Sequence, residues 1–258
     1  YMGIVREVNG MLELTEALPS SQFYNRDLAP VKLNKRTWGY YEYFSMWVGM
    51  SVCVPTWMLG ASMISAGFDW LTTVFTIFLG NLIVLLPMIL DSFAGTKYGI
   101  PFPVFLRSSF GLFGANIPAL LRGIIACGWF GIQTMIMAFA IDGILVALFP
   151  GYGEIKGVVP FFELPAHTVL SFAMSWLVTV AICYVSPPHK ASPGIRWLND
   201  LSSPILIAIG VGLLWWAVTK AGGWGPILDQ QRIAPWAKWP AFLTAMVAYW
   251  STLAINIP

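Results

Sequence analysis

Long apolar runs separated by short polar links are the main pattern along this chain of 258 residues. A helix needs about 20 mostly apolar residues to cross the hydrocarbon core of a bilayer. Five runs reach that length, roughly Tyr41–Ser65, Leu71–Leu90, Pro118–Phe149, Ala166–Tyr184 and Leu198–Thr219. A sixth run begins at Pro240 and is still apolar at Pro258. The pattern predicts an all-α polytopic membrane protein, with an N-terminal segment at 1–40 and a transmembrane domain at 41–258.

The composition supports this interpretation and excludes several classes of protein. Hydrophobic residues make up 57% of the chain and charged residues 10%, whereas an ordinary soluble domain has about 25% charged residues. The net charge of +2 is too small for a nucleic-acid partner. The three cysteines (Cys53, Cys127 and Cys183) lie in apolar runs without metal-ligand spacing, so we interpret them as reduced thiols.

The distribution of basic residues predicts the orientation in the membrane. Of the 14 Lys and Arg residues, ten lie in the N-terminal segment, the second-to-third link with the start of the third span, and the fourth-to-fifth link. The other side of the membrane receives four. We therefore expect a multi-pass protein of the plasma (inner) membrane with a cytoplasmic N-terminus, five complete spans and a truncated sixth.

Helix-breaking residues interrupt the first and sixth runs near mid-membrane. The first contains Gly49 and Pro55, and a proline removes one backbone donor and clashes with the carbonyl four residues earlier. The alternatives are a simple proline kink and a true break whose free backbone groups bind a ligand. The sixth run carries Tyr249 and Trp250, followed by Asn256 and Pro258.

The third run carries Trp129 and Gln133, which are four residues apart and share one helix face. Trp129 lies about 16 Å from the start of the run at Pro118, too deep for an interfacial belt. A carboxamide matches a cyclic amide edge, and an indole stacks on a flat ring. The pair therefore suits a planar, neutral nitrogen heterocycle; the alternative is a Gln that binds a neighbouring helix and a Trp that packs in the core.

Three other polar residues have ordinary explanations in the sequence. Asp142 lies about 36 Å along the third run from Pro118, where water reaches it, although a gating or ion role is the alternative. His167 and His189 lie in or beside loops and lack metal-ligand spacing.

Several motifs give the chain a family resemblance. They are Ala94–Val104 (AGTKYGIPFPV), Arg107–Gly111, Asn116–Arg122, Trp129–Thr134, Arg26–Val31 and Arg36–Trp38. With these motifs the chain resembles nucleobase–cation symporter family 1, which includes allantoin, uracil, cytosine and hydantoin permeases. The resemblance implies a LeuT-type fold of two inverted five-helix repeats, of which this fragment of a longer transporter would hold the first repeat and the start of the sixth helix.

The resemblance also implies residue roles. Substrate contacts fall on Trp129, Gln133, Trp250 and neighbouring Tyr249, and on Cys53, where the family more often has Gln or Asn. The backbone carbonyls of Gly49 and Val52 would bind the coupling cation, sodium or a proton, and no other cofactor is implied.

The leading hypothesis is a secondary active transporter that imports a nucleobase, allantoin or hydantoin type of heterocycle by cation-coupled alternating access. Its partners are the small heterocycle, a monovalent cation and the lipid bilayer. The alternatives are a passive channel or facilitator for small neutral solutes, and a membrane-embedded enzyme. The enzyme hypothesis is disfavoured because the sequence contains no HExxH or GxSxG motif and no intramembrane carboxylate pair.

Overall fold

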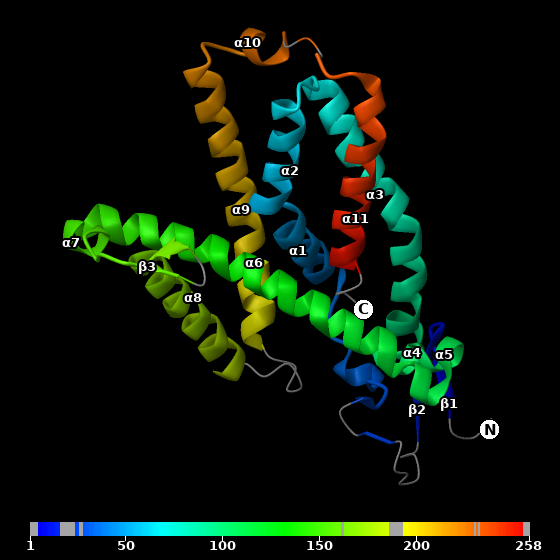
Figure 1. Ribbon diagram of the computed structural model, residues 1–258. Coiled ribbons are helices and arrows are strands. Elements are labelled where there is room, and N and C mark those ends of the chain that lie inside the picture. The colour runs from blue at the N-terminus through cyan, green and yellow to red at the C-terminus, as the bar shows by residue number, and fades with distance from the viewer. Residues whose placement is uncertain are drawn as a thin grey trace. The chain divides into compact units, whose positions relative to one another are not determined.

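The computed structural model is almost entirely helical (Figure 1) and describes residues 5–15, 24–25, 28–160, 163–185, 193–229, 231 and 233–254. The chain divides into two compact units. The first unit contains residues 1–120 and 196–258, and the second contains residues 121–195. Helix α6 begins in the first unit and continues through the second, and each unit is described by itself.

The elements of the first unit follow most of the predicted runs. They are β1 (Val5–Val8), β2 (Met11–Leu14), η2 (Leu33–Lys35), α1 (Tyr40–Ser51), α2 (Val54–Ser65), α3 (Trp70–Phe93), the π-helical turn η3 (Ala94–Tyr98), α4 (Phe102–Phe105), α5 (Arg107–Gly114), α9 (Pro193–Lys220), α10 (Gly225–Leu228), η5 (Trp236–Lys238) and α11 (Trp239–Ala254). Among the described residues, α3, α6 and α9 are each long and apolar enough to cross a membrane, and the bent pair α1 and α2 makes a fourth candidate span.

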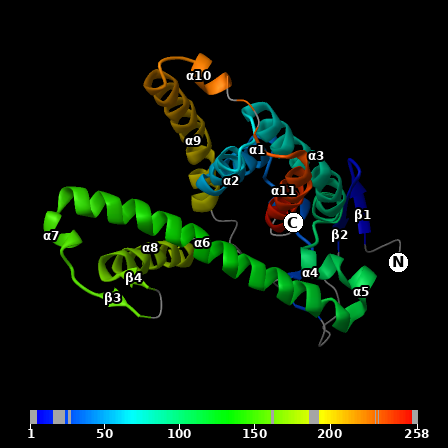
Figure 2. The same ribbon diagram turned by 45° about the horizontal axis from the view of Figure 1, so that its top comes forward.

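Helices α3 and α11 lie side by side and form the core of the first unit (Figures 1 and 2). Their close approach depends on Gly80, because a Cβ at this position would lie 2.8 Å from the Cβ of Met246. Met246 is 1% exposed and belongs to a hydrophobic cluster with Met63 and Phe68. The indole nitrogen of Trp239 also donates to Thr76 Oγ1 across the helices at 2.9 Å. Apolar burial and one shared hydrogen bond therefore fix α11 against α3.

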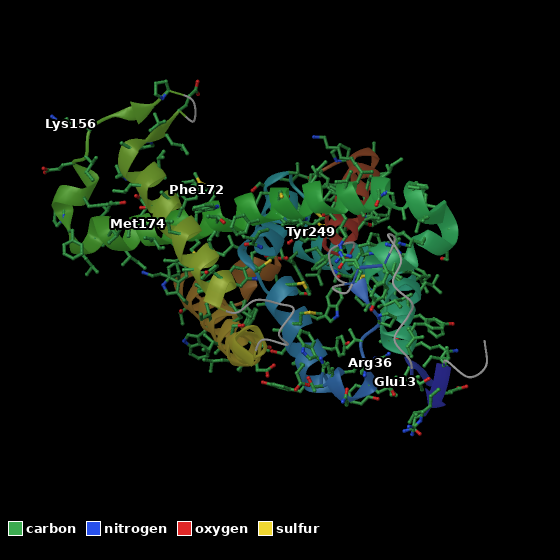
Figure 3. The ribbon with its side chains drawn as sticks, turned by 90° about the horizontal axis from the view of Figure 1, so that it is seen from below. Glu13, Arg36, Lys156, Phe172, Met174 and Tyr249 are labelled. Atoms are coloured by element: carbon green, nitrogen blue, oxygen red, sulfur yellow. The ribbon has the colours of Figure 1, made fainter. Side chains whose placement is uncertain are left out.

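The N-terminal segment folds as a β-hairpin, which we did not predict. Strands β1 and β2 pair antiparallel around Asn9 and Gly10, both with positive φ, and Asn-Gly between alternating residues is the typical signal of a two-residue turn. Arg36 donates to the carbonyls of Leu12 in β2 at 2.9 Å and of Thr96 in η3 at 3.2 Å. Arg36 and the hairpin lie together in Figure 3, so this arginine ties the hairpin to the end of α3.

The second unit is built from the rest of α6 (Asn116–Leu148), α7 (Pro150–Gly153), the short antiparallel pair β3 (Val158–Val159) and β4 (Leu164–Pro165), and α8 (Ala166–Val185). Helix α6 is continuous over 33 residues. Near the carboxyl end of α6, the carboxylate of Asp142 accepts from the Ser171 hydroxyl and lies 2.8 Å from His167 Nδ1, both at the start of α8. This unit therefore corresponds to most of the third and all of the fourth predicted run.

Candidate functional site

The predicted interruption of the first span is present, and it separates α1 from α2. Helix α1 ends at Ser51, α2 begins at Val54, and the two axes are bent by 46°. Val52 has φ −90° and ψ 70°, and Cys53 has the extended values −137° and 161°. Pro55 falls in the first turn of α2, where its missing N–H leaves no helix hydrogen bond unmade. The sequence GMSVCVP therefore encodes a true break.

A small polar cluster joins this break to α11. The hydroxyl of Thr56 lies 3.0 Å from the hydroxyl of Tyr249, and the Cys53 thiol lies 3.3 Å from Thr56 Oγ1 and 3.6 Å from Tyr249 Oη. The same thiol donates to the carbonyl of Met50 at 3.1 Å. Cys53 and Tyr249 are 196 residues apart in sequence, so the fold brings the first and sixth runs together at these two residues.

Trp250 follows Tyr249 but belongs to a different face of α11. It lines a cavity of about 530 Å³ together with residues of α1, α3 and η3, which include Tyr43, Trp47 and Asn81. The two rings of Tyr249 and Trp250 lie 5.1 Å apart, edge to face. Trp250 is 5% exposed, and its indole nitrogen is buried without a hydrogen-bond partner in the described part of the chain. Such an orphaned donor is uncommon in native structures.

The predicted cation ligands Gly49 and Val52 lie on the amino-terminal side of the break. The last carbonyls of a helix have no partner within it. At the end of α1, the carbonyl of Val48 accepts from the Val52 N–H at 2.8 Å, and that of Met50 accepts from the Cys53 thiol. Among the described residues no group of three or more His, Cys, Asp or Glu is arranged to hold a metal ion. The roles of Gly49 and Val52 stay predictions.

Trp129 and Gln133 lie on α6 in the second unit, whereas Cys53, Tyr249 and Trp250 lie in the first. Trp129 is partly buried and Gln133 is exposed within the unit. Their contact with a substrate, in company with Trp250, stays a prediction. Asn256 and Pro258, the second expected interruption of the sixth run, lie outside the described residues.

Two site residues escaped the sequence analysis. Thr56 bridges Cys53 and Tyr249. Asn81 lines the same cavity as Trp250, and its amide donates to the carbonyl of Ile77 at 2.9 Å. The signal for Asn81 was an amide inside the apolar run Leu71–Leu90. Thr56 gave no signal, because a threonine in a helix usually donates its hydroxyl to a backbone carbonyl of the same helix and so does not indicate a more distant partner.

Comparisons with known proteins find permeases among the relatives of this chain. The sequence model of the permeases for cytosine/purines, uracil, thiamine and allantoin matches residues 30–258. The chain is 38% identical over 241 residues to a purine-uracil permease of Arabidopsis thaliana. The aligned region covers 91% of this chain and 39% of the relative. It is 35% identical over 244 residues to an allantoin permease of Bacillus subtilis. Here the aligned region covers 93% of this chain and 49% of the relative.

A third relative is a uracil permease of Saccharomyces cerevisiae, 30% identical over 248 residues, with 92% of this chain and 38% of the relative covered. The chain therefore spans less than half the length of these curated relatives. No solved structure matches it. The family match covers most of the chain and agrees with the apolar helices, so this is a membrane protein that belongs to the permease family for cytosine/purines, uracil, thiamine and allantoin, nucleobase–cation symporter family 1.

Proposed function

We propose that the intact protein is a secondary active transporter that imports a planar nitrogen heterocycle by cation-coupled alternating access. The observation that carries the proposal is the break between α1 and α2 with its polar link to α11. Broken helices at mid-membrane are the usual place where transporters bind substrate and ion, because free backbone groups are tolerated there only when they line a cavity. The permease names of the relatives support a transporter rather than an enzyme.

The substrate class follows from the chemistry of the aromatic residues. Trp250 offers a flat indole face and a buried N–H without a partner. An unmade hydrogen bond of this kind costs about 1–3 kcal/mol, and a ring carbonyl or ring nitrogen is an acceptor that removes this cost. We propose that Trp129 stacks on the other face of the ring and that Gln133 binds its amide edge. Tyr249, Cys53 and the newly found Thr56 would close the site on the side of the break.

The coupling cation, sodium or a proton, would bind the backbone carbonyls of Gly49 and Val52. A charge that moves down about 100 mV releases roughly 2.3 kcal/mol, enough for about 50-fold accumulation of a neutral solute. This proposal includes the LeuT-type arrangement of two inverted repeats, a cytoplasmic N-terminus and a plasma (inner) membrane location. Residues 1–258 would contain the first repeat and the start of the second.

Uptake by the intact protein in proteoliposomes tests the proposal. Labelled uracil, allantoin, hydantoin, cytosine and a purine are supplied with a sodium gradient, a proton gradient or neither. We expect saturable uptake of at least one compound that rises with one of the gradients. Uptake that neither saturates nor responds to a gradient would instead support the passive channel, and chemical conversion of the compound without uptake would support an enzyme.

Two substitutions test the site itself. Trp250→Ala and Trp129→Ala each remove one stacking face, and stacking contributes about 1–3 kcal/mol per base, so we expect roughly a tenfold or larger rise in KM. Trp215→Ala is the matched control, because this tryptophan on α9 is 74% exposed. Unchanged KM in Trp250→Ala would remove the indole from the site, and a similar rise in Trp215→Ala would show that the effect is not local.

A further inference from the structure

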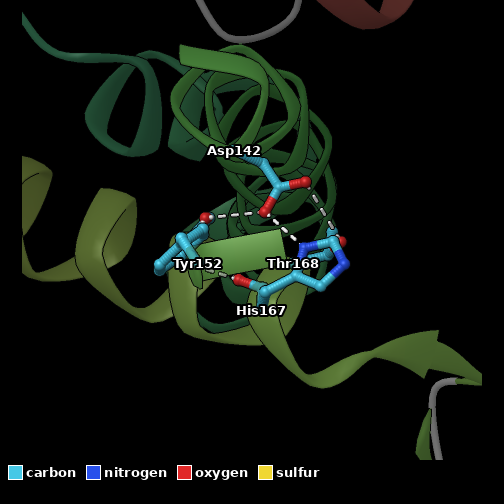
Figure 4. A network of polar contacts seen from close by, with 5 residues as sticks. Asp142, Tyr152, His167 and Thr168 are labelled. Carbon is cyan, nitrogen blue, oxygen red and sulfur yellow. Dashed lines mark hydrogen bonds and ion pairs between the residues drawn. The ribbon is translucent and has the colours of Figure 1, made fainter. Parts of the chain in front are cut away.

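A polar cluster in the second unit lies outside the proposed substrate site. Its central residue is Asp142, which together with Arg122 supplies the only charges in α6. Figure 4 shows Asp142 surrounded by side chains of α7 and α8. The side chain of Asp142 is 14% exposed and that of His167 is 18% exposed. The sequence predicted Asp142 at the membrane–water boundary and His167 beside a loop, and neither prediction indicated that the two residues are partners.

The carboxylate of Asp142 has three partners on α8. The Nδ1 of His167 lies 2.8 Å from Oδ1, and the Ser171 hydroxyl donates to the same oxygen at 3.1 Å. The Thr168 hydroxyl donates to Oδ2 at 3.4 Å. All three partners lie in the first two turns of α8, where the free N–H groups of the helix further stabilise a negative charge. Asp142 therefore joins the carboxyl half of α6 to the start of α8.

Tyr152 of α7 extends the cluster. Its hydroxyl lies 2.8 Å from the carbonyl oxygen of His167 and 2.7 Å from the hydroxyl of Ser171. Each hydroxyl has one hydrogen to donate, and Ser171 also lies within reach of Asp142. The two hydroxyls and the carboxylate thus form a chain whose hydrogens can reorient when the charge on the His167–Asp142 pair changes.

Of the residues in this cluster, His167 is the one that lines a pocket. A pocket of about 540 Å³ is lined by His167 with Glu154, Lys156, Pro165 and their neighbours, and Asp142 is not among the lining residues. Lys156, labelled in Figure 3, and Glu154 are exposed and carry opposite charges. Of the described groups packed around the imidazole, α6 contributes Asp142, α7 and its following loop contribute Tyr152, Glu154 and Lys156, and α8 contributes only uncharged hydroxyls.

We propose that His167 and Asp142 form a proton-binding site that makes transport depend on the pH at the extracellular face. The extracellular placement and the transport readout rest on the proposed function. Imidazole is the side chain that ordinarily changes charge between about pH 5 and pH 8. An imidazolium binds a carboxylate by a charge-assisted hydrogen bond, which is stronger than the bond from a neutral ring. Acidification therefore strengthens the link between α6 and α8, and loss of the proton weakens it.

The link bears on transport through α6. Gln133 lies nine residues before Asp142 on the same continuous helix, or about 13 Å along its axis. A change in how firmly α6 is tied to α8 changes the freedom of the segment that carries Gln133 and Trp129. The pair thus acts as a positioning device for the proposed site and not as a contact with the substrate.

The first test measures initial uptake by the intact protein in proteoliposomes, with the external pH varied from 5.5 to 8 and the gradient-independent exchange rate recorded alongside. The probe is whichever compound of the heterocycle panel is transported best. We expect at least about a threefold change in rate across this range for the wild type and a nearly flat profile for His167→Gln and Asp142→Asn. The control is His189→Gln, which removes the other histidine of this chain and keeps the wild-type profile. A wild-type profile in His167→Gln, or a flat profile in the wild type, would overturn the proposal.

The second test does not require transport. Diethylpyrocarbonate acylates the uncharged imidazole, and peptide mass spectrometry reports the acylated fraction of His167 in the intact protein at each pH. We expect acylation to rise with pH, as for imidazoles in general, and the acylated fraction at a given pH to be higher in Asp142→Asn, because the ring then lacks the carboxylate partner of its Nδ1. Asp142→Glu retains the charge and is expected to keep the wild-type profile, as is Thr168→Val. If no heterocycle is transported, the proposed function fails while this test still decides the proton site; an acylation profile unaffected by Asp142→Asn refutes the site.

Discussion

Two neighbouring apolar segments of the first unit each contain a glycine and a proline, but only one of the segments is broken. The first run has Gly49 and Pro55 and is broken, whereas α3 has Gly80 and Pro87 and remains one helix of 24 residues. The two glycines differ as well. A Cβ at Gly49 would meet no atom within 4 Å, but a Cβ at Gly80 would lie 2.8 Å from the Cβ of Met246.

The comparison shows that a proline breaks a membrane helix only where its surroundings stabilise the break. At Pro55, the preceding Cys53 adopts an extended conformation, its carbonyl accepts from the Trp57 N–H at 3.2 Å, and its thiol bonds the carbonyl of Met50 and contacts Tyr249. The carbonyls of Cys53 and Met50 thus have partners at the break. Near Pro87 the described contacts offer no such alternative, and the flanking helix turns continue. At the broken segment the proline is accompanied by side-chain contacts from a second helix, through Tyr249.

The largest expected effect sharpens the contrast between the two glycines. Gly80→Val places a branched side chain where α11 packs on α3, and overpacking of this kind costs about 1–3 kcal/mol or more. We expect a large loss of correctly folded intact protein, measured by size-exclusion chromatography and by thermal unfolding in detergent. Gly49→Ala is the comparison for stability alone, since it meets open space and gains helix propensity of up to about 1 kcal/mol. Equal destabilisation by both substitutions would contradict the assigned roles.

The next effect tests whether Pro55 maintains the break. Pro55→Ala restores an N–H that can bind the carbonyl of Ser51 and removes the steric clash of the ring, so a continuous helix becomes favourable. We expect uptake to fall about tenfold, equivalent to about 1.4 kcal/mol, while the protein stays folded. Spin labels at Phe44 and Met58, both well exposed, report the change in bend as a change in their separation.

Pro87→Ala is the matched control for this experiment, because α3 is already continuous at that position and the side chain faces outward. It is expected to leave both uptake and the separation of the labels unchanged. An unchanged separation in Pro55→Ala would mean that Cys53 and its neighbours maintain the break without the proline. A comparable loss of uptake in Pro87→Ala would point to a general effect of proline replacement.

The helices and the interruption of the first span were predictable because they depend on local patterns. Runs of apolar residues located all six helical segments, with α1–α2, α3, α6, α8, α9 and α11 covering them. Backbone chemistry at Gly49 and Pro55 predicted an interruption there, but it left open whether the interruption is a kink or a true break. The family followed from motifs such as AGTKYGIPFPV. The N-terminal hairpin was also local, since Asn9 and Gly10 between alternating residues are a sufficient signal.

The contacts between distant residues were not predictable from one sequence. Cys53 meets Tyr249 and Asp142 meets His167 across separations of 196 and 25 residues, and nothing in the composition of either segment selects its partner. The depth estimate for Asp142 treated α6 as isolated, and therefore assigned the carboxylate to water. In the folded chain three side chains of α8 replace that water. A polar residue in an apolar run indicates that a polar group will be buried at a cost in free energy, but only the structure shows which hydrogen bonds offset that cost.

The smallest expected effect concerns Thr56, which connects the broken helix to α11. Thr56→Val removes its hydrogen bonds to Tyr249 and Cys53 at nearly constant volume, and one such bond contributes about 1 kcal/mol. We expect a modest decrease in the thermal midpoint of the intact protein, while Thr56→Ser, which keeps the hydroxyl, stays close to the wild type. If Thr56→Val also raises the KM for uptake while leaving the maximal rate unchanged, the cluster positions the substrate as well as the helices.

A double-mutant cycle with Tyr249→Phe separates this contact from general disturbance of the helix. If the two hydroxyls bind each other, the free energies of the single changes will not add, and the coupling will be about 0.5–1 kcal/mol. The same cycle with Thr76→Val, whose hydroxyl accepts instead from Trp239 at the start of α11, should be additive. Additivity in both cycles would show that the break is held by the backbone and the thiol alone. In that case Tyr249 would approach α2 without stabilising it, and the difference from α3 would reduce to the conformations of Val52 and Cys53.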